Sequence, residues 1–338
     1  MPNHSAAQPN HAVTAEQLLS IWQQHPELEW AAGFLVDRRG SSYRKPGAMM
    51  LFNSLGQHFG LLSGGCVEQQ LMQQANRCIT NRQATLLELD LQADEDAENW
   101  QAAIGCGGAI SVVIAPLSEQ NDHLQLASAY QLLTANQCTR ITIEGLDEGS
   151  ADNLKASCAP AAMPKCRLGN SAELADDRAT FTLTLQPSPR LFIAGAGIDA
   201  VPLAQMASQL GWQVSVNETR SRQQRSMLPA TIERLAIQAP ADCQPMLEAD
   251  SIIIMHHNLA LDTQWLAASL RSKASYIGVL GPKHRLDHLL VQAGTSREDF
   301  EGRLHGPCGL PLGGDTPASV ALSIISDVHR TLATVLTD

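Results

Sequence analysis

The sequence RLFIAGAGIDA at residues 190–200 decides the fold of the C-terminal half of the chain. An apolar run leads directly into the spacing of Gly195, Gly197 and Ala200, and a segment rich in Ala and Leu follows to about residue 210. In a βαβ unit the first glycine permits a tight turn, the second lets a pyrophosphate approach, and a small third residue lets helix and strand pack. This pattern predicts a Rossmann-like parallel-sheet domain over residues 188–338.

Further apolar runs support this prediction. Residues 212–216 predict a second strand that leads to Glu218, and an acidic side chain at this spacing can accept a hydrogen bond from a ribose hydroxyl. Residues 251–255 and 275–280 predict buried parallel strands that end close to His257 and Gly281. Ligands bind at that edge of an open parallel sheet.

Two features of this edge leave its ligand open. Asp199 lies inside the glycine turn, where its charge would repel a phosphate, so the fold can be present with nucleotide binding altered or lost. His257 suits a proton donor, a ligand or a phosphate partner, but it is equally explained as a strand-end histidine that bonds to the backbone.

The N-terminal half has a different organisation. Thr14 and Gln17 have the spacing of a capping box, which predicts a helix that begins there. We expect a mixed α/β domain over residues 1–147 and a connector with one short strand over residues 148–187, where small and polar residues show weak periodicity. The elements expected in the first domain are strands at 31–36, 48–52, 58–62, 85–91 and 109–115 and a helix at 68–78.

Two cysteines of this domain lie in glycine loops, SGGCVE at residues 63–68 and GCGG at residues 105–108. Glycine lets a backbone approach a ligand closely, and a thiolate in such a loop can attack, undergo redox chemistry or bind a soft metal. Alternatively, Cys66 and Cys106 are small residues in tight turns. The glycines that frame them are Gly64, Gly65, Gly107 and Gly108.

Composition limits the function classes. The 338 residues are 44% hydrophobic and 17% charged, which indicates a globular protein with more than one core. A net charge of −11 argues against a general nucleic-acid or anionic-membrane binder. We find no bilayer-spanning run, no signal peptide and no CxxC pair, so we expect a cytoplasmic protein whose eight cysteines are thiols.

Taken together, these motifs resemble the XdhC/CoxI family over nearly the whole chain. Two departures are Ala115 before Pro116 and the run TPAS at residues 316–319, where the family commonly has acidic residues. The motifs that carry the resemblance, in order, are GSSYRKPGAM (40–49), SGGCVE (63–68), CGG (106–108), the glycine turn (195–200), YIGVLG (276–281) and GLPLGGDTP (309–317).

The resemblance implies a maturation factor for molybdenum hydroxylases such as xanthine dehydrogenase. Such a factor binds molybdenum cofactor, protects it during terminal sulfuration with a cysteine desulfurase, and aids its insertion into the apo-enzyme. Cys66 or Cys106 would then contact molybdenum or protect its sulfur, whereas Arg44 suits a phosphate contact or plain surface charge. The residues expected to bind cofactor are Gly64, Gly65, Cys66, Cys106, Gly107, Gly108, Arg44, Gly195, Gly197, Glu218, His257 and Gly281.

Two other classes of function stay open. An NAD(P)-dependent oxidoreductase would use the Rossmann-like domain, with His257 as its proton relay. A thiol-redox enzyme would form a reversible disulfide between Cys66 and Cys106. The occupancy of the nucleotide site by NAD(P) or another nucleotide, and a homodimeric state, also stay open.

Overall fold

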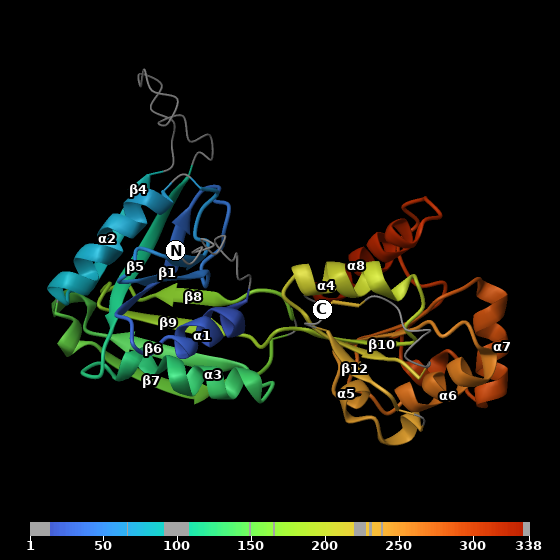
Figure 1. Ribbon diagram of the computed structural model, residues 1–338. Helices are drawn as coiled ribbons and strands as arrows, with labels where there is room; N and C mark the ends of the chain where they lie inside the picture. The colour runs from blue at the N-terminus through green and yellow to red at the C-terminus, as the bar shows by residue number, and fades with distance from the viewer. Residues whose placement is uncertain are drawn as a thin grey trace, which may run out of the picture. The chain divides into compact units, whose positions relative to one another are not determined.

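The computed structural model describes residues 14–65, 67–90, 108–148, 150–164, 166–219, 228–229, 232–237 and 239–333. The chain divides into two compact units (Figure 1). Unit 1 comprises residues 1–164 and 169–188, and unit 2 comprises residues 165–168 and 189–338.

The first sheet of unit 1 has five antiparallel strands in the order β3-β2-β1-β5-β4. The central strand β1 is buried from Trp30 to Val36, and its side chains alternate between two cores. Ala31 and Leu35 pack with helix α2, which covers one face (Figure 1). The bounds are β1 Trp30–Arg39, β2 Met49–Asn53, β3 His58–Gly60, α2 Glu68–Asn81, β4 Thr85–Asp90 and β5 Ala109–Leu117.

The opposite face of β1 packs in a core shared with a second sheet. Phe34 lies 5.5 Å from Phe181 between ring centroids, and both are in a cluster that also includes residues of α1 and α3. The capping box that begins α1 is confirmed, because the Thr14 hydroxyl accepts from the Gln17 N–H and the Gln17 side chain accepts from the Thr14 N–H. The helices are α1 Ala15–Gln24 and α3 Leu126–Thr134.

This second sheet differs from the expected connector. It has four antiparallel strands in the order β7-β6-β9-β8, so residues 148–187 supply three strands instead of one. The two unexpected strands, β7 and β8, lie at the edges and are largely exposed, which explains their weak apolar alternation. The bounds are β6 Thr139–Glu144, β7 Lys155–Pro160, β8 Ser171–Leu174 and β9 Thr180–Leu185.

Unit 2 has the predicted Rossmann-like sheet, with six parallel strands in the order β12-β11-β10-β13-β14-β15. From β10 the chain adds β11 and β12 on one side of the sheet and then returns to add β13, β14 and β15 on the other side. The strand order therefore reverses between β10 and β13, and doubly wound folds form a ligand crevice at such a switch point. The strands are β10 Arg190–Ala194, β11 Gln213–Asn217, β12 Glu233–Leu235, β13 Ser251–Ile254, β14 Tyr276–Val279 and β15 Leu304–His305.

Helices cover both faces of this sheet, which explains why its central strands β10, β13 and β14 are largely apolar and buried (Figure 1). Helices α4 and α8 pack in one core, and α5, α6 and α7 contribute to the other. The bounds are α4 Ala200–Gln209, α5 Gln244–Leu247, α6 Leu259–Ser269, α7 Lys283–Ala293 and α8 Pro317–Ala333.

A buried polar contact joins α8 to the sheet. The Tyr276 hydroxyl donates to Asp327 Oδ2 at 2.9 Å and accepts from the Gly309 N–H at 3.2 Å. Arg330 Nη2 lies 2.6 Å from Asp327 Oδ1. Burial alone would raise the pKa of Asp327, but the hydrogen bonds from Arg330 and Tyr276 hold that pKa below its usual value.

We expect Tyr276→Phe to lower the free energy of unfolding by about 1–3 kcal/mol, because it removes a donor from a buried carboxylate. A depressed pKa of Asp327 stabilises the fold above the unfolded pKa of about 3.9, and this contribution is lost as pH falls through the folded pKa. The difference between wild type and variant should therefore shrink below about pH 4. Urea unfolding of both proteins at several pH values measures this difference in unfolding free energy.

Tyr130→Phe is the control, since the Tyr130 hydroxyl makes no hydrogen bond among the residues that the structure describes. A Tyr276→Phe effect no larger than that of Tyr130→Phe would contradict the assigned role of the contact.

Candidate functional site

The glycine turn of unit 2 packs directly against the backbone at the end of β13. Gly195 has φ +112°, and a Cβ atom there would lie 2.7 Å from the backbone nitrogen of His256 and from the carbonyl carbon of Met255. No side chain fits in this space without backbone movement. Gly195 therefore brings the two strands of the switch point into close contact, as the tight turn of the fingerprint requires.

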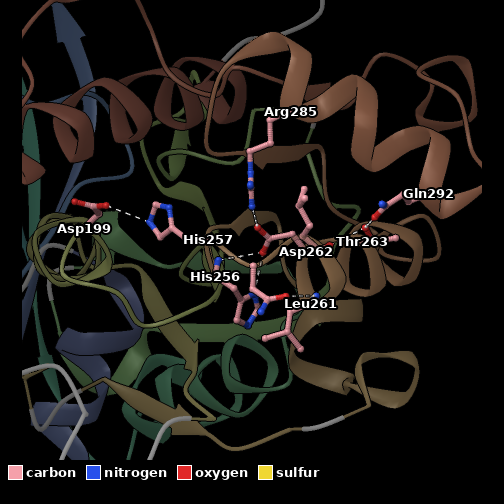
Figure 2. A network of polar contacts seen from close by, with 10 residues as sticks. Asp199, His256, His257, Leu261, Asp262, Thr263, Arg285 and Gln292 are labelled. Atoms are coloured by element: carbon pink, nitrogen blue, oxygen red, sulfur yellow. Dashed lines mark hydrogen bonds and ion pairs between the residues drawn. The ribbon is translucent and has the colours of Figure 1, made fainter.

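An ion pair closes the start of helix α4. Asp199 is the N-cap residue, and its Oδ2 lies 3.3 Å from Nε2 of His257 (Figure 2). His257 has φ +59°, an uncommon conformation for a residue other than glycine, and its side chain is 55% exposed. A Cβ at Gly197 would lie 3.8 Å from the His257 ring. The turn thus brings Gly197 and His257 together, as expected for one site.

This pair changes what the turn can bind. A helix N-terminus attracts anions, and in dinucleotide-binding folds it holds the pyrophosphate. Here the Asp199 carboxylate already supplies a negative charge at the N-cap of α4. The arrangement disfavours a pyrophosphate, in agreement with the repulsion expected from the sequence.

A buried network supports the same edge (Figure 2). Asp262 Oδ1 accepts from the His256 backbone N–H at 3.0 Å and lies 3.1 Å from its Nδ1, while Arg285 Nη2 lies 2.5 Å from Asp262 Oδ2. The side chain of Asp262 is 1% exposed. The network fixes the end of β13 against α6 and α7. Sequence patterns do not reveal it, because an aspartate one turn into a helix has no distinctive local signal.

Gly281 is part of this support. It has φ +123°, and a Cβ there would lie 2.6 Å from Cδ of Arg285. The missing side chain leaves room for the Arg285 stem, which reaches Asp262. Its ligand-binding role stays a prediction, but its packing role is clear.

Glu218 lies at the end of β11, but its carboxylate is covered. The side chain is 1% exposed, and Arg234 Nη1 lies 3.9 Å from its Oε2. The Glu218 backbone N–H donates to the Leu235 carbonyl at 2.7 Å, which extends the pairing of β11 with β12. In this arrangement the carboxylate is buried with Arg234 as a nearby cation. A ribose contact from Glu218 stays a prediction.

In unit 1, the loop of residues 41–47 lies against Gly108 and next to Gly64, one residue from each glycine loop. We call it the SSYRKPG loop, after its sequence. A Cβ at Gly108 would overlap the Ser41 carbonyl oxygen and lie 2.6 Å from the carbonyl oxygen of Arg39. A Cβ at Gly64 would lie 3.8 Å from Cγ of Tyr43. The fold therefore brings Gly64 and Gly108, which are far apart in sequence, against one short segment.

The first of these glycine loops is held by the start of α2. Glu68 Oε1 accepts from the backbone N–H of Ser63 at 3.2 Å and from its hydroxyl at 2.8 Å, and Oε2 accepts from the Val67 N–H at 3.2 Å. Gly64 and Gly65 remain exposed, and Gly65 has φ +101°. Glu68 thus positions Ser63 and Val67. From the sequence alone, its place in the first turn of a helix indicates only a residue that is favoured by the helix dipole.

The remaining expected residues are placed as follows. Arg44 is half-buried, and burial lowers the pKa of its guanidinium. Its carbonyl accepts from the Ser42 hydroxyl at 2.6 Å. Cys66, Cys106 and Gly107 lie outside the described residues.

The described ranges contain neither a metal cluster nor a membrane span. Among these residues no group of three or more His, Cys, Asp and Glu side chains is placed to hold a metal ion. No helix in the same ranges is long and apolar enough to cross a membrane.

The doubly wound six-stranded sheet of unit 2, preceded in sequence by a unit with two further sheets, defines a two-unit α/β protein with a Rossmann-like domain. Residues 25–90 match the XdhC and CoxI family, and residues 191–328 match the XdhC Rossmann domain. The chain belongs to the XdhC and CoxI family.

Similar proteins cover most of the chain. A probable xanthine dehydrogenase subunit of Bacillus subtilis is 27% identical over 88% of this chain and 91% of its own. The molybdenum cofactor insertion chaperone PaoD of Escherichia coli is 23% identical over 87% of this chain and 80% of its own. The crystal structure of a xanthine dehydrogenase from Bacillus halodurans has a TM-score of 0.77 and 26% identity, covering 96% of this chain and 98% of that one.

We expect Gly195→Ala to lower the free energy of unfolding by at least about 2 kcal/mol, because the added Cβ meets backbone atoms and the positive φ adds strain. Gly197→Ala is the matched control, since its Cβ would meet only the His257 ring at ordinary contact distance. Chemical unfolding of both variants measures the difference. Equal losses of unfolding free energy in the two variants would show that the close approach of Gly195 to β13 is not needed for stability.

Proposed function

We propose that the protein is a maturation factor that binds molybdenum cofactor as cargo and delivers it to a molybdenum hydroxylase of the xanthine dehydrogenase type. The observation that carries this proposal is that Gly64 and Gly108, one from each glycine motif, both lie against the SSYRKPG loop. The name of the PaoD relative, an insertion chaperone, supports the same role.

The chemistry of the cargo suits the residues around the SSYRKPG loop. Molybdenum cofactor has a dithiolene-bound soft metal at one end and a phosphate at the other. Exposed glycine backbone at Gly64 and Gly65 and the cationic side chains of Arg44 and Lys45 suit the anionic end. Thiolates suit a soft metal, so we assign Cys66 and Cys106 to the molybdenum end.

In this role the protein holds the cofactor and protects it, and it does not need to catalyse a reaction. Glu68 accepts hydrogen bonds from Ser63 and Val67, and Gly108 packs against the backbone of Ser41. Groups that are already held in place lose little conformational entropy when cargo binds. We further propose that a cysteine desulfurase sulfurates the cofactor while it is held here.

Unit 2 supports this proposal less directly. The Asp199 carboxylate at the start of α4 and the buried Glu218 disfavour the binding mode of an NAD(P)-dependent oxidoreductase. We therefore give unit 2 no hydride-transfer role.

The test compares cofactor retention and transfer for Cys66→Ser and Cys106→Ser. Each variant is purified anaerobically from a host that makes molybdenum cofactor, assayed for bound molybdenum and pterin, and incubated with an apo molybdenum hydroxylase. We expect loss of a thiolate contact to lower molybdenum retention about 10-fold or more. Client activation should fall in parallel.

Cys158→Ser is the matched control, because Cys158 lies on β7 and hydrogen-bonds with Thr139, away from both glycine loops in sequence. Unchanged retention and unchanged client activation in both test variants would remove the thiolate assignment. Absence of pterin from the wild-type protein would overturn the proposed function as a whole.

A further inference from the structure

Tyr43, in the middle of the SSYRKPG loop, is unusually exposed for an aromatic residue. Its relative exposure is 66%, whereas most large apolar side chains of unit 1 are buried. The loop that carries it is held at both ends, since Gly47 N–H donates to the Leu35 carbonyl at 2.8 Å and Gly108 packs on Ser41. The ring is thus presented by a fixed segment.

The Tyr43 ring lies beside exposed glycine backbone. Its ring atoms lie 3.8 and 3.9 Å from the position that a Cβ of Gly64 would take. Gly65 follows, and apart from its neighbours in the chain no described atom lies within 4 Å of the position of its Cβ. An aromatic ring next to two glycines forms a platform on which a planar molecule can lie, because no side chain rises from the glycine backbone.

Four cationic residues lie close to Tyr43 in sequence, in a chain whose net charge is −11. Arg44 and Lys45 directly follow Tyr43, and Arg38 and Arg39 end the strand before the loop. Arg39 is engaged by Glu88 at 3.7 Å, whereas Arg38 and Lys45 are exposed. A flat aromatic surface with cations beside it fits a planar heteroaromatic ring that bears an anionic group.

We propose that Tyr43 stacks on the pterin ring of the cargo and thereby orients the cofactor beside Gly64. This proposal rests on the proposed function and adds the residue that recognises the organic part of the cofactor. Arg44 and Lys45, which directly follow Tyr43, suit the phosphate of the same cargo.

The test separates recognition of the ring from recognition of the metal. Pterin retention after gel filtration is measured by fluorescence of the oxidised pterin, at several concentrations of two probes. One probe is molybdenum cofactor released anaerobically from a purified molybdenum hydroxylase, and the other is metal-free molybdopterin. The variants are Tyr43→Leu, Tyr43→Phe and Tyr43→Trp.

We expect Tyr43→Leu to weaken binding of both probes about 10-fold, as loss of one aromatic stacking contact does for other planar rings. Tyr43→Phe and Tyr43→Trp should bind both within about 3-fold of wild type, since stacking needs the ring and not the hydroxyl. Leu55→Ser is the control, because Leu55 is 67% exposed in the same unit but lies in the turn between β2 and β3.

Three results would overturn the proposal that Tyr43 stacks on the pterin ring. Wild-type affinity of Tyr43→Leu for both probes would show that the ring does not contact pterin. Normal pterin binding combined with lost client activation would show that Tyr43 contacts the client protein instead. Equal losses in Tyr43→Leu and Tyr43→Phe would assign the effect to the hydroxyl. If wild type binds neither probe, the proposed function itself fails, which is a distinct outcome.

Discussion

Direct backbone contact at glycine is the constraint on which both units depend. Gly195 lets the end of β10 touch the end of β13, and Gly108 lets the second glycine loop touch the backbone of Ser41. In each case a Cβ would occupy space that a backbone atom fills, so the geometry does not tolerate another residue. Main-chain packing at these glycines therefore positions the candidate sites together with the hydrogen bonds of Glu68 and Asp262.

The charged residues around these glycine contacts differ between the two units. In unit 2 the edge of the sheet is closed by its own charges, with Asp199 against His257 and Asp262 between His256 and Arg285. In unit 1 the described glycines Gly64 and Gly65 are exposed, and the exposed Lys45 lies in the SSYRKPG loop. Cargo binding in unit 1, with unit 2 not holding a dinucleotide, is the division of roles that we propose.

Sequence patterns predict the parts of the fold that have a local signal. The central parallel strands β10, β13 and β14 are buried, so they are largely apolar runs, and the turn at Gly195 identifies the first of them. The edge strands β7 and β8 are not predicted, because a half-exposed edge strand buries too little to need an alternating pattern.

The site is only partly predictable for a related reason. The glycine loops are visible as motifs, but their convergence on the SSYRKPG loop depends on tertiary contacts between residues far apart in sequence. The burial of Glu218 beside Arg234 and the bonds of Asp262 to His256 have no sequence signature either. Such pairings follow from the sheet order, which local periodicity does not specify.

The most direct test of the account is the content of the wild-type protein, purified anaerobically from a host that makes molybdenum cofactor. Molybdenum, pterin and nicotinamide nucleotide are each measured per chain. The account requires pterin and molybdenum in equal amounts, with nicotinamide nucleotide absent. Tightly bound nicotinamide nucleotide without pterin would contradict it and would favour an oxidoreductase.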